Sequence, residues 1–217
     1  MPALDPGLQL LDADPEASHA LHAVAVDHVL SAGGDACWID PGHHARTAPL
    51  VDVAPSDRIL DRVRVARGFT AFQHLALLES LPDLLTDRTA LIVVPDVDGY
   101  YRDDDLLATE GQEMLLTGLA SLAQVARTAD IPVVLTRRED DSFSAPVANA
   151  ATRTIRCEAT RLGPRFRTDD AESDETLVYP VAESGLVQTT LAFWKRVLTA
   201  RHPQAGPTRE VTARGAD

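Results

Sequence analysis

Short apolar runs alternate with segments of helical periodicity along the first two thirds of the chain. The runs are bounded by turn residues, as strands buried on both faces of a parallel sheet are. The segments between them space apolar side chains three or four residues apart, as amphipathic helices do. The pattern predicts strands at residues 8–11, 36–39, 63–65, 90–94 and 131–136, and helices at 16–32, from 55, from 71 to near 82 and at 109–128.

Two of the predicted helices carry end signals. Thr70 and Gln73 fit a capping box, in which the threonine caps the helix and the glutamine side chain reaches back to it. Gly33 and Gly34 follow the first helix, where glycine commonly closes a helix. These signals place the end of the first helix and the start of the third.

Alternating strands and helices predict the fold class, because they form a parallel sheet with helices on both faces. After Thr136 the pattern changes to short runs at 152–157, 177–181 and 186–189, which predict antiparallel strands at the sheet edge. A last helix is expected at 191–200. We therefore expect one α/β domain over residues 1–200, with a mostly parallel central sheet, and a disordered polar tail over 201–217.

The charge of the chain is strongly acidic. The formal net charge is −13, from 33 acidic and 20 basic residues, and Lys195 is the single lysine. An acidic, lysine-poor surface is typical of proteins from salt-loving archaea, because concentrated salt screens the repulsion between carboxylates. We expect a halophilic protein. Net acidity also disfavours a general nucleic-acid binder, although a local basic site remains compatible with it.

The compartment follows from features along the whole sequence. No apolar run approaches the roughly 20 residues of a membrane span, and the first residues are acidic, unlike a secretory signal. Cys37 and Cys157 sit in apolar or alternating stretches and are expected to be buried thiols in a reducing compartment. We therefore expect a cytoplasmic protein that does not contact a membrane.

Five segments occur in a recognisable order. They are Trp-Ile-Asp-Pro-Gly at 38–42, Val-Arg-Val-Ala-Arg-Gly-Phe-Thr-Ala-Phe-Gln-His at 63–74, Leu-Ile-Val-Val-Pro-Asp at 91–96, Tyr-Tyr-Arg at 100–102 and Thr-Arg-Arg at 136–138. In this order and spacing the chain resembles the ATPase core of the RecA/RadA recombinase superfamily over about residues 8–190. The segment at 63–74 is the most specific. The resemblance implies a RecA-like P-loop ATPase fold.

The phosphate-binding loop of that family is altered. A working loop reads G-x-x-x-x-G-K-[ST], whose amides and lysine hold phosphates and whose hydroxyl holds magnesium. The matching stretch runs from Asp12 through Ala17 to Ser18 and His19. Ser18 stands in the place of the lysine and His19 in that of the magnesium hydroxyl, and both glycines are absent. The resemblance therefore implies a degenerate loop.

Three further catalytic features of the family are altered as well. Without a gap, Pro95 takes the place of the metal-site aspartate, and a shift of one residue would place Asp96 there. The catalytic glutamate falls on Gly42, and the nucleotide-sensing Asn-Gln falls on Arg137 and Arg138. We therefore expect no ATPase activity and no cofactor. Isochorismatase-like and α/β-hydrolase alternatives fail, because the one lysine follows both cysteines and no G-x-S-x-G occurs.

The resemblance implies two alternative non-catalytic roles, and an enzyme with a relocated site is a third alternative. In the first, the chain is a non-catalytic recombinase paralogue that forms a hetero-oligomer with a recombinase or another paralogue and assists DNA recombination and repair. In the second, it is a RecA-like inhibitor of a partner outside recombination, of the SulA cell-division type. An exposed apolar patch on the degraded nucleotide face would favour the second role. The histidines His19, His22, His43 and His44 lack Cys or Glu ligands at a recognised spacing, so no metal site is expected.

A cluster of arginines follows the strand that ends at Thr136. Seven arginines and four acidic residues lie between 137 and 167, an excess of +3 in a chain of net −13. Arginine suits phosphate contacts and base stacking, and the family contacts single-stranded DNA in the loop after this strand. The alternative is that these arginines pair with neighbouring carboxylates. The candidate residues for single-stranded DNA are Arg137, Arg138, Arg153, Arg156, Arg161, Arg165 and Arg167.

Overall fold

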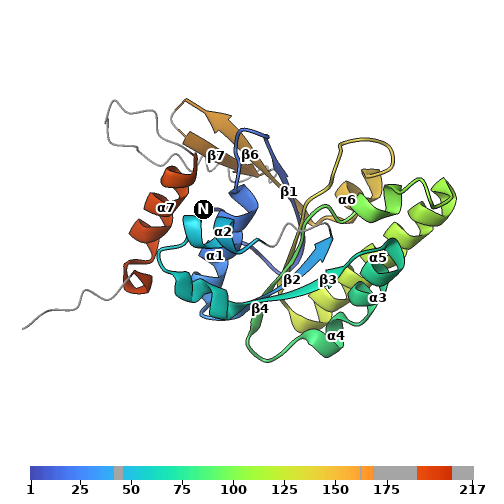
Figure 1. Cartoon of the computed structure of the whole chain (residues 1–217), viewed down its shortest axis with the longest axis horizontal. Helices are drawn as coiled ribbons and strands as arrows, with labels where there is room; N and C mark the ends of the chain where they lie inside the picture. Colours follow the sequence, from blue (N-terminus) through green and yellow to red (C-terminus); the bar gives the residue numbers. More distant parts are fainter. Residues whose placement is uncertain (42–45, 162, 169–189, 207–217) are drawn as a thin grey trace, which may run out of the picture.

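A seven-stranded, mostly parallel sheet forms the centre of the protein in a computed structural model that describes residues 1–41, 46–161, 163–168 and 190–206 (Figure 1). The strand order is β3-β2-β4-β5-β1-β6-β7, and all neighbouring pairs are parallel except β6 and β7. The expected α/β class is confirmed. The strands are β1 (Gly7–Ala13), β2 (Asp35–Pro41), β3 (Val63–Gly68), β4 (Thr89–Val94), β5 (Pro132–Leu135), β6 (Arg153–Thr160) and β7 (Gly163–Thr168).

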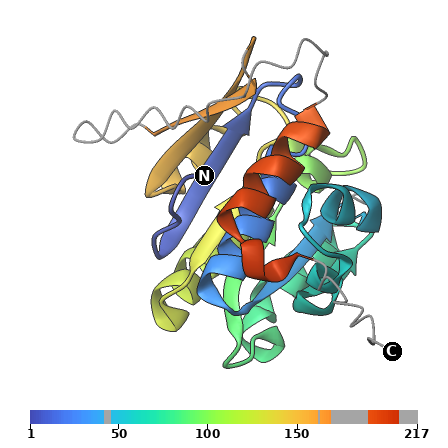
Figure 2. The same cartoon turned by 90° about the vertical axis from the view of Figure 1, so that its left-hand side faces the viewer.

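Helices cover both faces of the sheet (Figures 1 and 2). One layer consists of α1 (Ala20–Ala32), α2 (Thr47–Val53) and α7 (Thr190–Arg201), with the 3-10 turns η1 (Asp57–Arg62) and η3 (Pro203–Ala205). The other consists of α3 (Ala71–Glu79), α4 (Leu81–Leu84), α5 (Ala108–Ala129) and α6 (Ala145–Ala150), with the 3-10 turn η2 (Gly99–Arg102). The sheet therefore lies between two helical layers.

Each face of the sheet has its own hydrophobic core, because successive strand residues point to opposite faces. Leu11, Trp38 and Val93 pack under the layer of α1 and α7. Leu10 and Ile92 pack under the layer of α3 and α5. This alternation explains why the central strands β2, β4 and β5 are mostly apolar on both faces. The cores hold the strands in register and so fix where the side chains at the strand ends lie.

Several predicted elements differ from the structure in their bounds. The first helix starts at Ala20 and not at 16, because His19 adopts a left-handed conformation with φ of 67°. The helix expected from 55 is the short 3-10 turn η1, and α2 was not predicted. The capping box at α3 forms in part: the Thr70 hydroxyl accepts from the Gln73 amide at 3.2 Å, but the Gln73 side chain accepts from the Phe69 amide at 2.9 Å.

The region after Thr136 also differs from the expectation. The predicted strand at 152–157 is β6, which runs parallel to β1 and not antiparallel, because the connection through α6 reverses the chain direction once more. The antiparallel strand is β7, which was not predicted. The strands expected at 177–181 and 186–189 lie outside the described residues. The last helix is confirmed as α7.

The start of the expected tail is ordered. Arg201 donates two hydrogen bonds to the Asp27 carboxylate, at 2.7 and 3.1 Å, and the ring Nε2 of His202 lies 2.8 Å from the same group. Residues 203–205 then form η3. The folded part therefore extends at least to Gly206, and residues 207–217 lie outside the described part.

Two expectations about the compartment can be compared with the fold. Cys37 and Cys157 are both buried free thiols, as expected. Burial raises the pKa of both thiols, that of Cys157 to about 12. Within the described residues, no helix combines the length and the apolar character that crossing a membrane requires.

Candidate functional site: an ion-paired cleft at the carboxyl edge of the sheet

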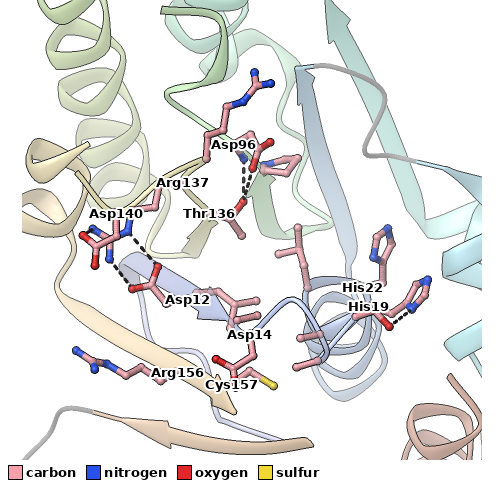
Figure 3. Close-up of a pocket in the computed structure, with 18 of the residues that line it drawn as sticks. Asp12, Asp14, His19, His22, Asp96, Thr136, Arg137, Asp140, Arg156 and Cys157 are labelled. Atoms are coloured by element: carbon pink, nitrogen blue, oxygen red, sulfur yellow. Dashed lines mark hydrogen bonds and ion pairs between the residues drawn. The ribbon is translucent and has the colours of Figure 1, made fainter. Parts of the chain in front are cut away.

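A cleft of about 640 Å³ opens where β1, β4, β5 and β6 end and α1 begins (Figure 3). Ligands of open α/β sheets commonly bind at this edge. The cleft brings together the residues of the degenerate loop, both candidates for the metal-site aspartate, and three of the candidate arginines. Its charged lining consists of Asp12, Asp14, Asp96, Glu139, Asp140 and Glu158 and of Arg137, Arg138 and Arg156.

Arg137 is the centre of an ion-pair cluster in this cleft. Its Nε and Nη2 donate to the two oxygens of Asp12 at 3.1 and 2.8 Å, and its Nη1 lies 2.6 Å from Asp140 (Figure 3). The Arg137 side chain is only 10% exposed. Burial works to lower the pKa of this guanidinium, but hydrogen bonding and attraction to Asp12 and Asp140 outweigh it and raise the pKa. The cluster therefore joins the carboxyl ends of β1 and β5 through a fixed positive charge.

The loop from Asp14 to His19 forms hydrogen bonds within the protein. The amide of Ala17 donates to the Asp14 carbonyl at 2.8 Å, and the amide of Ala20 donates to the Ala17 carbonyl at 3.2 Å. The Asp14 carboxylate accepts from the Ala159 amide at 2.9 Å. Backbone amides that bind a phosphate must point at it. The amides of Ala17 and Ala20 instead donate to carbonyl groups of the loop.

Helix α7 holds the same loop from outside. The indole Nε1 of Trp194 donates to the Ser18 carbonyl at 3.0 Å, and the Thr190 hydroxyl donates to the Glu16 carbonyl at 3.3 Å. Trp194 is fully buried against Phe166 and Phe193. The sequence did not reveal this contact, because it joins residues 176 positions apart. The loop is therefore fixed by packing from the far end of the chain.

Phosphate does not suit the loop residues. Ser18 has no ammonium group, and its hydroxyl lies 3.2 Å from His19 Nδ1. Asp12 and Asp14 add negative charge where a P-loop has none. A further negative charge placed 4 Å from one carboxylate costs from about 1 kcal/mol in water to about 4 at a protein surface. The residues at this end of the cleft therefore do not fit a magnesium nucleotide.

Asp96, and not Pro95, presents a carboxylate to the cleft. Its backbone is left-handed, with φ of 42°. Its amide donates to the Thr136 hydroxyl at 2.8 Å, and that hydroxyl lies 3.4 Å from its Oδ1 (Figure 3). Pro95 is buried at the end of β4. Of the two candidate positions, Asp96 is therefore the one whose carboxylate is available to the cleft. Gly42, on which the resemblance places the catalytic glutamate, lies outside the described residues.

A second charged cluster, which sequence reasoning missed, lies behind the cleft. The Asp98 carboxylate is fully buried and accepts from Arg102 Nε at 2.6 Å and from the Arg138 amide at 2.7 Å. Arg102 also donates to both oxygens of Asp141, at 2.7 and 2.8 Å. Its Cζ lies 4.7 Å from the centroid of the Phe143 ring. The hydrogen bond from Arg102 lowers the pKa of Asp141 well below its usual range. This cluster fixes the backbone of the loop that carries Arg138.

The seven candidate arginines do not form one surface. Arg137 is bound to Asp12 and Asp140, and Arg153 donates to the Ala3 carbonyl and to Asp5. Arg156 and Arg167 face each other across β6 and β7, and Arg165 faces Glu158. Arg138, Arg156, Arg161 and Arg167 are exposed and Arg165 is half-buried. Arg167 also donates to Glu158 at 3.3 Å.

The cleft histidines His19 and His22 form tilted ring contacts. The ring centroids of His19 and His22 are 5.9 Å apart, and those of His22 and Trp38 are 5.3 Å apart. Across the described residues no group of three or more His, Cys, Asp or Glu side chains could hold a metal ion. His43 and His44 lie outside these residues.

A small apolar surface lies at the far end of the same edge. Phe69 and Phe72 are 62% and 61% exposed, directly after β3, and Val65 on β3 is 45% exposed. Within the described sheet β3 pairs with β2 alone. Exposed aromatic side chains beside an open strand edge are typical of surfaces that contact another protein.

The fold and the cleft together define an α/β protein with an ion-paired cleft at the carboxyl edge of its sheet. No protein-family model matches the chain, and no curated protein matches its sequence.

Proposed function

We propose that the protein is a non-catalytic relative of the RecA/RadA core that assists DNA recombination and repair by binding a recombinase or a recombinase paralogue. The observation that carries this proposal is the ion pair between Arg137 and Asp12. On the proposed alignment, the pair falls where an ATPase of this kind would hold phosphate. A fold of this kind whose nucleotide position is filled by its own side chains favours a binding role over ATP hydrolysis.

The strand order brings the altered positions together. In the sheet, β5 lies between β1 and β4. The degenerate loop follows β1, Asp96 follows β4 and the Arg137 segment follows β5, so the altered catalytic positions meet in one cleft. Their convergence favours a common ancestor with an ATPase over a chance match of sequence.

The surface around β3 supports partner binding. Phe69 and Phe72 expose apolar area that a monomer in water would otherwise keep small. Arg64 on the same strand is exposed and adds a positive charge, whereas Arg67 is paired with Asp40 at 2.8 Å. A partner with apolar and acidic side chains fits such a surface. A hetero-oligomer in which this chain adds no nucleotide site follows from the proposal.

The same aromatic residues favour the second candidate function, a RecA-like inhibitor of a protein outside recombination. That role needs an exposed apolar patch at the degraded nucleotide edge, and Phe69 and Phe72 lie at the carboxyl edge of the sheet. The cleft itself is charged and not apolar. The patch therefore supports partner binding in both roles, and the partner's identity distinguishes them.

The experiment is an affinity purification of the tagged chain from its native host. The composition favours a halophilic, cytoplasmic protein, so the purification is done in the native salt. Mass spectrometry identifies what is recovered. Recovery of a recombinase or its paralogues supports the proposal. Specific recovery of a division protein or another unrelated partner, without recombinase, rejects it in favour of the second role.

A further inference from the structure

We infer that the fork of Arg137 is a latent oxyanion site that the Asp12 carboxylate keeps filled. A guanidinium that donates Nε and Nη2 in parallel matches a carboxylate, a sulfate or a phosphate equally well. Asp12 uses this geometry, at 3.1 and 2.8 Å. The carboxylate of the chain therefore takes the position that a ligand oxyanion would take.

The guanidinium of Arg137, which would receive the anion, is already held in place by the fold. The Arg137 side chain is 10% exposed, and its third nitrogen is held by Asp140 at 2.6 Å, so the guanidinium cannot turn freely toward water. β5 ends one residue before Thr136 and positions Arg137 from a buried strand. A fixed, partly desolvated cation binds an anion more strongly than a mobile surface arginine does.

The carboxylate of Asp12, which fills the fork, can be removed by substitution. Asp12 lies at the end of β1, and its side chain is 29% exposed toward the cleft. Shortening it to alanine removes the carboxylate and leaves space beside the fork that is continuous with the cleft of about 640 Å³. A small oxyanion from solution can reach this space. The inference concerns the contacts of the cleft and does not depend on a role in repair.

The experiment measures the melting temperature of Asp12→Ala in formate, sulfate or phosphate, with chloride replaced at constant ionic strength. A saturable rise with at least one of these anions is expected, because an oxyanion that binds the folded state stabilises it. Wild type should show only the unsaturable background. Asp12→Asn should show a smaller rise than Asp12→Ala, since its carboxamide keeps the volume of the side chain but offers the fork one acceptor in place of two.

Two controls separate this site from general salt effects. Asp35→Ala breaks a similar two-point pair, in which Arg88 is 64% exposed, and should show no saturable rise. Asp12→Ala combined with Arg137→Gln removes the receptor and should lose the rise. If Asp12→Ala is unfolded in chloride, the same anions should restore its circular dichroism.

The inference is overturned if Asp12→Ala responds to every anion as Asp35→Ala does, or if no anion restores an unfolded Asp12→Ala. A rise that persists when Arg137→Gln is added also overturns it, because the anion would then bind elsewhere. If the inference fails, the affinity purification still tests the proposed function, since partner binding uses the separate surface at β3.

Discussion

The guanidinium of Arg137 and the carboxylate of Asp12, 125 residues apart in the chain, form a two-point ion pair across the carboxyl ends of β5 and β1. Under the proposed kinship with the RecA/RadA core, the pair fills the position where an ATPase would contact phosphate. The same proposal would account for two departures from the family pattern together, because an acid after β1 and an arginine after β5 compensate each other. At the inner end of the cleft, the positive charge of Arg137 is thus paired with carboxylates of the protein itself.

The first prediction concerns this pair. Asp12→Ala should lower the free energy of unfolding in chloride by about 3 kcal/mol, because it leaves the nearly buried Arg137 with a single partner. Arg137→Met should cost less, since Asp12 and Asp140 are 29% and 80% exposed and can be rehydrated. The double variant should therefore be more stable than Asp12→Ala alone. Urea unfolding measures all three, and strictly additive losses would contradict the pairing.

A second prediction concerns pH. Burial lowers the pKa of His74 from 6.5 to about 4, and the ring Nδ1 lies 2.9 Å from the Tyr101 hydroxyl. The unfolded chain binds this proton more readily, so the contribution of the neutral ring is complete above pH 6.5 and is lost as the pH falls toward 4. Between pH 7 and 4.5 wild type should lose about 2–3 kcal/mol more than His74→Gln does.

The comparison between the two proteins isolates His74, because the carboxylates titrate in both. Urea unfolding at the two pH values provides the measurement. Equal losses in wild type and His74→Gln would show that the folded ring accepts a proton as easily as the unfolded one.

A third prediction concerns the arginines. Single-stranded DNA, if bound, should contact Arg156 and Arg167, which face each other on β6 and β7. Arg156→Glu with Arg167→Glu should weaken retention of a single strand. Losing two phosphate contacts should reduce the slope of log affinity against log salt by about 1.4. Arg127→Glu, an exposed arginine at the end of α5, is the matched control. Equal binding by both variants would remove this face from the site.

A fourth prediction concerns the surface at β3. Phe69→Ser with Phe72→Ser should leave stability within about 0.5 kcal/mol of wild type, because both rings are more than half exposed. The same variant should fail to recover the partner in the affinity purification. Leu116→Ser on α5, which is 50% exposed, should recover it. Recovery by the phenylalanine variant would place the partner surface elsewhere.

The sequence predicted the parts of the fold that depend on local pattern. The strand at 90–94 and the helix at 109–128 were recognisable because apolar periodicity is strong there. Helix α2 was missed because seven residues with a proline carry little periodicity. The start of α1 was misplaced because nothing local announced the left-handed conformation of His19.

The site was predictable only in part. The altered loop and the arginines after Thr136 were identified as candidates, but their pairing was not, because a contact over 125 residues depends on the strand order. Charge counting also treated seven arginines as one cluster. The sheet separates them, since Arg153 and Arg137 are bound to Asp5 and Asp12 in less exposed places, whereas Arg156 and Arg167 are exposed on β6 and β7, where Arg167 also pairs with Glu158.

The measurement that tests the central claim most directly is a thermal-shift titration of wild type with magnesium and ATP in high salt. Because Asp12 fills the Arg137 fork and the loop lacks a lysine, the melting temperature should not change with nucleotide. A saturable, concentration-dependent rise, or ATP hydrolysis abolished by changing a residue of this chain, would contradict the account.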